Sequence, residues 1–88
     1  MNKEDNMELK DTVELMNSSD YKDRFKAEYC QTKIRYEKLR KMLIKWDAGT
    51  LEFTPTCPKH ILLEQERYMR EYILCLETRA EIEGVVLE

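Results

Sequence analysis

Aromatic rings, hydrogen-bonding groups and cations recur at helical spacing in two stretches of the chain. Arg79 lies among apolar residues, where a guanidinium is costly unless a partner or an anionic ligand neutralises it. Tyrosine and tryptophan rings can stack on a nucleobase, and nearby cations can bind phosphate oxygens. On this chemistry the candidate ligand-binding residues are Arg79, Tyr72, Gln65, Tyr68, Tyr36, Thr32, Arg40, Lys33 and Trp46.

The same residues have structural interpretations that stay open at this stage. Arg79 could form an ion pair with Glu83, one turn further on, or with an acid of another helix. The tyrosines and Trp46 could form the core of a helical hairpin with their hydroxyls at its edge. Arg40 and Lys33 could be solvated surface residues.

Residue types suited to catalysis or metal binding are sparse. Cys57 and His60 form a C-x-x-H pair, which is half of a zinc site, and no second pair has suitable spacing. Glu64, Glu66 and Glu71 would lie mainly on the wet face of a helix, and two separated glycines cannot build a phosphate-binding loop. We therefore expect no enzyme activity, no metal site and no cofactor.

The composition favours one small, helical domain. The chain has 88 residues, of which 42% are apolar and 38% charged, with a net charge of −3. With only two Gly and two Pro, it has too few turns for a β-sandwich or barrel. The length allows a single domain, and a small helical core often gains stability by oligomerising.

Positive charge is concentrated in the middle of the chain. Residues 20–47 carry nine basic and five acidic side chains, a local balance of +4, whereas residues 58–88 carry four basic and seven acidic ones. These segments could simply attract each other across a hairpin. Alternatively, the basic residues create a field for an anionic ligand: Lys33, Arg35, Lys38, Arg40, Lys41 and Lys45.

Hydrophobic spacing predicts a short helix within residues 7–16 and two long ones. The first long helix begins after a cap at Ser19 or Asp20 and ends at Gly49. Its apolar and aromatic seam alternates steps of four and three residues, as in a coiled coil: Phe25, Tyr29, Thr32, Tyr36, Leu39, Leu43 and Trp46. After a linker, the second long helix is expected from about Pro58 to Glu83.

The last helix is predicted to bury a face centred on Tyr72. At about 100° per residue, that face collects Ile61, Leu62, Gln65, Tyr68, Met69, Tyr72, Cys75, Leu76, Arg79 and Ile82. Apolar residues also lie on the far sides of both long helices, which predicts a second contact with the N-terminal helix or another subunit. The candidate interface residues are Ile34, Cys30, Leu63 and Leu74.

The predicted fold class is therefore all-α: an antiparallel helical hairpin of two long helices plus a short N-terminal helix, forming a homo-oligomer. Residues 1–6 are expected to be a polar tail and residues 7–88 a single helical domain.

Several features point to the cytoplasm. No stretch approaches the ~20 apolar residues that span a bilayer, and the polar N-terminus has no hydrophobic region of a signal peptide. Three cysteines, an odd number, suggest free thiols in a reducing compartment. The acidic pI of about 5.3 disfavours binding to duplex nucleic acid.

Four stretches carry a family resemblance: DTVELMNSSDYKDRFKAEY (11–29), TKIRYEKLRKMLIKW (32–46), TLEFTPTCP (50–58) and YILCLETRAEIEG (72–84). They resemble small phage and prophage proteins of gut phages, including crAss-like phages, over about residues 7–88. That resemblance implies a phage origin, action in the cytosol and an accessory role.

The last helix is also similar, in broad pattern, to that of helical sponge proteins that counter the CBASS and Thoeris defences. The match is a ring-bearing half followed by Arg79 and Ala80, although the Arg-Trp and Gln-Gln features of that helix are absent here. This similarity implies capture of a cyclic nucleotide or a cyclic ADP-ribose derivative between subunits.

Two functions follow as hypotheses. The favoured one is a non-catalytic phage counter-defence protein that binds and sequesters a nucleotide-derived immune signal, and it predicts that Arg79→Ala abolishes binding while the fold survives. The alternative is a protein–protein interaction module that inhibits or adapts a host or phage protein. In that case changes at Ile34 or Leu74 should matter more than changes at Arg79.

Overall fold

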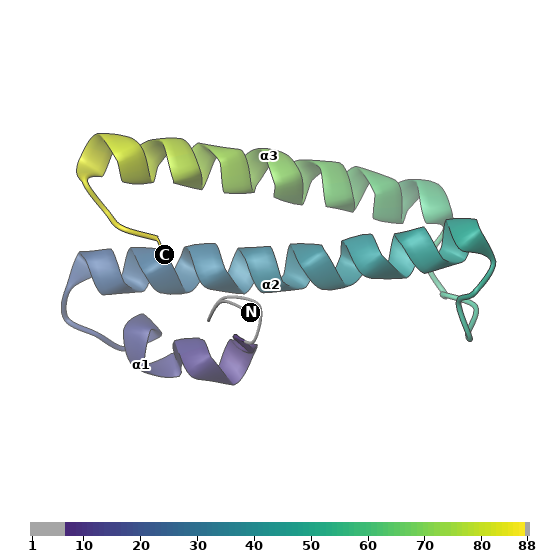
Figure 1. Cartoon of the computed structure of the whole chain (residues 1–88), viewed down its shortest axis with the longest axis horizontal. Coiled ribbons are helices and arrows are strands. Elements are labelled where there is room, and N and C mark those ends of the chain that lie inside the picture. The colour runs from purple at the N-terminus through teal and green to yellow at the C-terminus, as the bar shows by residue number, and fades with distance from the viewer. Residues whose placement is uncertain (1–6, 88) are drawn as a thin grey trace.

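The chain forms two long antiparallel helices with a short helical segment packed on one side (Figure 1). The structure is a computed structural model and describes residues 7–87. The elements are a 3-10 turn, η2 (Leu9–Thr12), and three helices, α1 (Val13–Met16), α2 (Tyr21–Ala48) and α3 (Lys59–Glu83). This confirms the predicted all-α hairpin; the predicted polar tail, residues 1–6, lies outside the described residues.

Both long helices end on a glycine in the left-handed conformation. Gly49 has φ 77° and Gly84 has φ 70°, a region that side chains with a Cβ rarely adopt. At its start, α2 is capped by the Asp20 side chain, which accepts a hydrogen bond of 3.0 Å from the Lys22 amide. The boundaries of α2 therefore agree with those predicted from the sequence.

α2 is the central element, because η2 and α1 contact one of its sides and α3 another (Figure 1). On the η2–α1 side, Gln31 Nε2 donates a 2.9 Å hydrogen bond to the hydroxyl of buried Thr12. Ala27, one turn before Gln31, is buried on this side as well. The N-terminal segment thus covers part of the second apolar strip that the sequence predicted on this helix.

The core lies between α2, α3 and the end of the chain. Its buried cluster comprises Phe25, Tyr29, Ile73, Leu76, Ala80 and Val85, with Cys30, Tyr36 and Leu87 packed against it. Leu43 is also buried, nearer the hairpin end of α2. The seam predicted for α2 is therefore the face that meets α3.

The predicted buried face of α3 is wrong by roughly a quarter turn. Ile73, Leu76 and Ala80 are the buried residues, whereas Ile61, Gln65, Tyr68, Tyr72, Cys75, Arg79 and Ile82 are exposed. The physical reason is desolvation: Ile73, Leu76 and Ala80 bury only apolar atoms. A face centred on Tyr72 would also remove the Gln65 amide and the Arg79 guanidinium from water.

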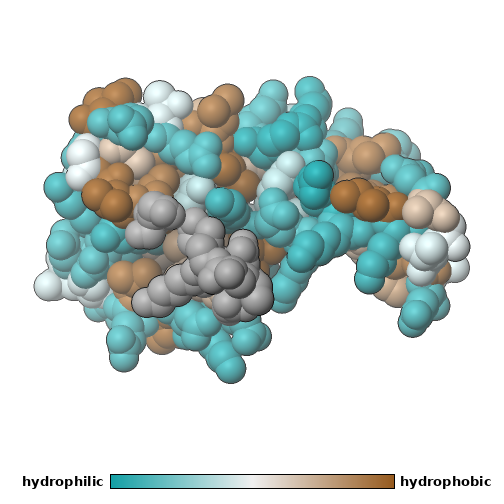
Figure 2. Space-filling model, in the orientation of Figure 1, coloured by the Kyte–Doolittle hydropathy of each residue, from teal (hydrophilic) through white to brown (hydrophobic). Residues whose placement is uncertain are grey.

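Much apolar surface is left in contact with solvent. Figure 2 shows apolar patches between the charged groups on the face it displays, and α3 in particular exposes Leu63, Tyr68, Leu74 and Ile82. No helix within residues 7–87 combines the length and apolar character that crossing a bilayer requires.

Candidate functional site

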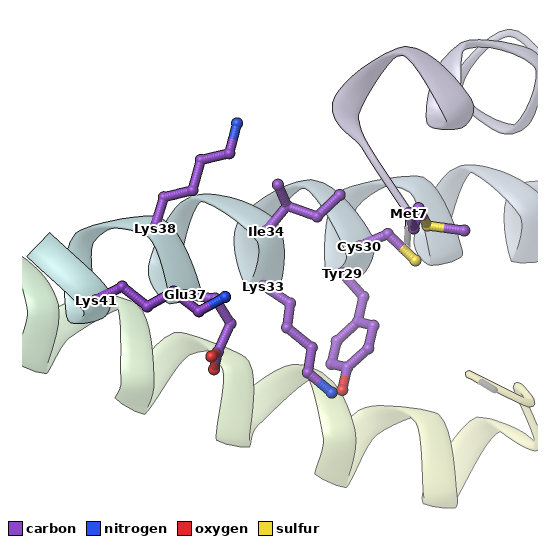
Figure 3. A pocket seen from close by; sticks show the side chains of 8 residues that line it. All are labelled: Met7, Tyr29, Cys30, Lys33, Ile34, Glu37, Lys38 and Lys41. Atoms are coloured by element: carbon purple, nitrogen blue, oxygen red, sulfur yellow. The ribbon is translucent and has the colours of Figure 1, made fainter. Parts of the chain in front are cut away.

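A groove along α2 is lined by lysines and by apolar side chains (Figure 3). We call it the lysine groove; its volume is about 260 Å³. Lys33, Lys38 and Lys41 supply the cations, while Cys30 and Ile34 supply apolar atoms. The four-residue spacing aligns Lys33 and Lys41 along one side of the helix, and Cys30, Ile34 and Lys38 along the neighbouring side.

The electrostatics of the lysine groove favour an anionic ligand. Three lysines stand against one acid, Glu37, which leaves a balance of +2. The Lys33 Nζ lies 5.6 Å from the centroid of the Tyr29 ring, and Figure 3 shows that amine beside the Tyr29 hydroxyl. Lysine ammonium groups bind phosphate or carboxylate oxygens through charge-assisted hydrogen bonds.

Tyr29 forms the inner wall of the lysine groove and is held from α3. Its hydroxyl donates a 2.8 Å hydrogen bond to Oε2 of Glu77. Burial raises the pKa of Tyr29, and the hydrogen bond to Glu77 raises it further, while Lys33 acts in the opposite direction. The hydroxyl therefore stays protonated and fixed on Glu77.

The structure distributes the predicted ligand-binding residues over several surfaces. Gln65, Tyr68 and Tyr72 line a shallow, largely apolar hollow of about 470 Å³ on the outer face of α3. Lys33 lies in the lysine groove. Trp46 lies at the hairpin end, where the Lys59 Nζ is 5.4 Å from its ring centroid.

The other predicted ligand-binding residues of α2 are not gathered into these sites. Thr32 donates its hydroxyl hydrogen bond to the Glu28 carbonyl at 2.8 Å. Tyr36 packs against the core cluster, and Arg40 is exposed. The nine predicted residues thus do not form one pocket within this chain.

Arg79 is exposed and paired, which corrects the expectation that it lies in a buried stripe. Its Nε and Nη2 donate to the Glu83 carboxylate at 2.7 and 3.2 Å. Its guanidinium carbon lies 4.5 Å from the centroid of the Phe25 ring. The hydrogen bond from Arg79 lowers the pKa of Glu83. The ion pair with Glu83 that the sequence offered as an alternative is therefore confirmed.

Some residues of the lysine groove were given another role by the sequence. Cys30 and Ile34 were predicted to contact the N-terminal helix or another subunit, and in the structure they line the groove; the predicted subunit interface stays a prediction. Lys38 and Lys41 belonged to the predicted basic field but were not among the candidate site residues. Their spacing from Ile34, four and seven residues, is the signal that places them on one side of the helix.

The remaining predicted residues lie at separate places. Leu63 and Leu74 are exposed on α3. Cys57 is half-buried and His60 exposed. Among residues 7–87, no group of three or more His, Cys, Asp or Glu side chains could hold a metal ion.

Comparison with known proteins identifies a family. The family model described as Sequestin matches residues 19–82, which include α2, the linker and nearly all of α3. No curated protein gives a significant match to the chain. No solved structure gives one either.

Proposed function

This chain belongs to the Sequestin family, and from that membership together with the lysine groove we propose that it binds and sequesters an anionic, nucleotide-derived small molecule. The ligand is held without being chemically changed. The observation that carries this proposal is a groove lined by three lysines, Lys33, Lys38 and Lys41, together with the apolar atoms of Cys30 and Ile34.

The proposed ligand is an immune signalling molecule, and the proposed role is phage counter-defence in the cytoplasm of an infected bacterium. The family name denotes sequestration. The resemblance to small phage proteins and helical sponges supports the biological setting. Sequestration needs a stoichiometric, long-lived complex and no reactive group.

The chemistry of the lysine groove suits such a ligand. Phosphate oxygens would accept hydrogen bonds from the lysine ammonium groups, and a base or sugar would pack on Ile34 and Cys30. Hydrogen bonds to charged groups contribute about 1.5–3 kcal/mol each. The volume of about 260 Å³ is slightly below the ~300 Å³ at which pockets for drug-sized ligands begin. The groove therefore holds part of a dinucleotide-sized ligand and leaves the rest outside.

Isothermal titration calorimetry on paired variants tests the proposal. Lys38→Ala/Lys41→Ala removes two cations of the groove. Arg35→Ala/Lys45→Ala is the matched control, because it removes two exposed cations of the same helix that do not line the groove.

We expect the groove variant to weaken binding of a cyclic dinucleotide or cyclic ADP-ribose at least tenfold, and the control variant less than threefold. Equal losses in both variants would mean that a general positive field, and not the groove, attracts the ligand. Unchanged binding in the groove variant would place the ligand elsewhere.

Contact of the ligand with Arg79, Tyr72, Tyr68 and Gln65 stays a prediction, since these residues lie outside the lysine groove. Titration of Arg79→Ala with the same ligands distinguishes binding in the lysine groove from binding on the outer face of α3. A loss confined to Arg79→Ala would assign the ligand to the outer face of α3.

The exposed apolar residues of α3 favour a second function, that of a protein-interaction module. Leu74 is 63% exposed, and a helix face of this kind can dock on a host or phage protein. This function predicts that Leu74→Ala releases a captured host protein while both lysine variants retain it, as measured by affinity capture.

A further inference from the structure

A second hollow lies beside the lysine groove and shares part of its wall. We call it the tail hollow, because residues 84–87 form one of its sides; its volume is about 560 Å³. Tyr29 and Lys33 line both the lysine groove and the tail hollow, so the two spaces adjoin at these residues. The tail hollow is also lined by Glu77 and Glu81 of α3 and by Val85 and Val86.

Tyr29 and Lys33 form the boundary between the two spaces. Figure 3 shows both side chains extending from α2 toward α3, whereas Lys38 points away from α3. The Tyr29 ring is buried, and its hydroxyl donates a 2.8 Å hydrogen bond to Glu77. Tyr29 is therefore a fixed wall, and a ligand that reaches Lys33 from the lysine groove also reaches the edge of the tail hollow.

The side of the tail hollow formed by residues 84–87 is held in place. Gly84 turns the chain in the left-handed conformation, with φ 70°. The Val85 amide then donates a 2.9 Å hydrogen bond to the Ala80 carbonyl, and Val85 belongs to the buried core cluster. Figure 1 shows the chain running back from α3 toward α2 after this turn. The tail hollow is therefore formed by the fold itself, as small-molecule sites usually are.

The two spaces differ in charge. The lysine groove has a balance of +2, from three lysines and Glu37. In the tail hollow two acids, Glu77 and Glu81, stand against Lys33, which leaves a balance of −1. A phosphate is therefore favoured in the lysine groove and disfavoured in the tail hollow. Carboxylates instead accept hydrogen bonds from N–H and O–H groups.

We propose that the tail hollow is a second subsite, which binds a nucleoside part of the ligand whose phosphates lie in the lysine groove. This inference rests on the proposed function. The exposed Glu81 carboxylate accepts hydrogen bonds from the base or ribose, and the apolar face of the base packs on Val86, which is 68% exposed. Lys33 binds a phosphate where the two parts of the ligand join. The volume of the tail hollow lies within the ~300–1,000 Å³ of small-molecule sites.

The donors that Glu81 would bind come from one of two sources. Guanine presents its N1–H and its 2-amino group side by side, which suits the two oxygens of one carboxylate. Cyclic ADP-ribose presents adjacent ribose hydroxyls, and acidic residues also bind ribose hydroxyls. In cyclic di-GMP one of these two hydroxyls on each ribose is esterified. Cyclic di-GMP and cyclic ADP-ribose are therefore the two probes that distinguish the base from the ribose.

Isothermal titration calorimetry of Glu81→Gln tests the subsite through the sign of the effect. If the ligand lay in the lysine groove alone, removal of a nearby negative charge would leave its binding unchanged or make it tighter. Loss of hydrogen bonds in the tail hollow would instead weaken binding. We expect at least fivefold weaker binding of cyclic di-GMP if Glu81 binds the base, or of cyclic ADP-ribose if it binds the ribose. Unchanged or tighter binding of both probes overturns the proposal.

Glu71→Gln is the matched control for Glu81→Gln. It makes the same charge change at an exposed residue of α3 that lines neither space. Binding of both probes to Glu71→Gln should stay within twofold of the wild-type chain. A loss as large as that of Glu81→Gln would contradict the proposal, because the effect would then not depend on the tail hollow.

Inorganic pyrophosphate separates failure of this inference from failure of the proposed function. It offers phosphates without a nucleoside, so its binding should weaken in Lys38→Ala/Lys41→Ala and should not weaken in Glu81→Gln. If Glu81→Gln weakens pyrophosphate binding too, the variant acts on the phosphate site and the tail hollow is refuted. Nucleotide probes that lose affinity only in the lysine variant refute the tail hollow and leave the proposed function standing. Probes that do not bind, or that ignore the lysine variant, overturn both.

Discussion

The position of Ile73 gives the sharpest stability test of the hairpin. Ile73 is 8% exposed and its neighbour Leu74 is 63% exposed, so the two residues report on a buried and an exposed part of the α3 surface. Ile73→Ala and Leu74→Ala each delete three carbon atoms. At about 0.8 kcal/mol per buried carbon, the loss of transfer free energy at Ile73 is about 2.4 kcal/mol.

Two smaller effects change the expected loss of stability for Ile73→Ala. The cavity left between α2 and α3 adds to the loss, and the better helix propensity of alanine recovers about 0.4 kcal/mol. We therefore expect Ile73→Ala to lower the free energy of unfolding by about 2–4 kcal/mol. Leu74→Ala should lower it by about 0.5 kcal/mol. The first value is most of the ~3–5 kcal/mol that a core of this size supplies.

Urea denaturation followed by circular dichroism measures both variants at one protein concentration. The midpoint should shift strongly for Ile73→Ala and little for Leu74→Ala, with unchanged slopes. Equal shifts, or a larger shift for Leu74→Ala, would refute the orientation of α3.

Three further predictions concern the lysine groove and the end of α2. Tyr29→Phe deletes the hydroxyl that donates to Glu77 and should cost about 1 kcal/mol in urea denaturation at pH 7. Because the folded pKa of Tyr29 is raised above its ordinary value of 10.0, this contribution is complete below pH 10 and is lost as the pH rises further. The stability difference between the wild-type chain and Tyr29→Phe should therefore shrink above pH 10, and a constant difference would contradict this. Gly49→Ala forces a side chain into φ 77° and should lower the free energy of unfolding by about 1 kcal/mol; a neutral result in thermal melts would show that the cap relaxes. Ligand affinity should fall with added salt for the wild-type chain, and less steeply for Lys38→Ala/Lys41→Ala; identical salt slopes in calorimetry would remove these two lysines from the site.

The fold of α2 could be predicted because its local signals agree. Asp20 and Gly49 mark its ends, and the seam from Phe25 to Leu43 has one regular spacing. The buried face of α3 could not be predicted in the same way, since two seams overlap on that helix. A hydropathy pattern counts Tyr72 as apolar, and only packing against α2 shows that Ile73 is the buried neighbour.

Part of the candidate site could likewise be predicted from the sequence, and part could not. The basic character of α2 follows from its composition, and the predicted basic field includes Lys33, Lys38 and Lys41, which the structure places along the groove. The groove itself depends on how η2 and α1 pack on α2. They cover the helix around Ala27, while Ile34 and Lys38 line the open groove. The spacing of these residues places them along α2, but which part of the helix stays open depends on the tertiary structure and could not be predicted from the sequence.

Native mass spectrometry tests the central claim, sequestration of an anionic nucleotide-derived ligand, most directly. The protein would be sprayed alone and with a panel of cyclic di- and trinucleotides and cyclic ADP-ribose isomers. We predict a discrete added mass that corresponds to an intact, unmodified ligand and that is absent from Lys38→Ala/Lys41→Ala. No uptake from the panel, or release of a chemically altered ligand, would contradict the account.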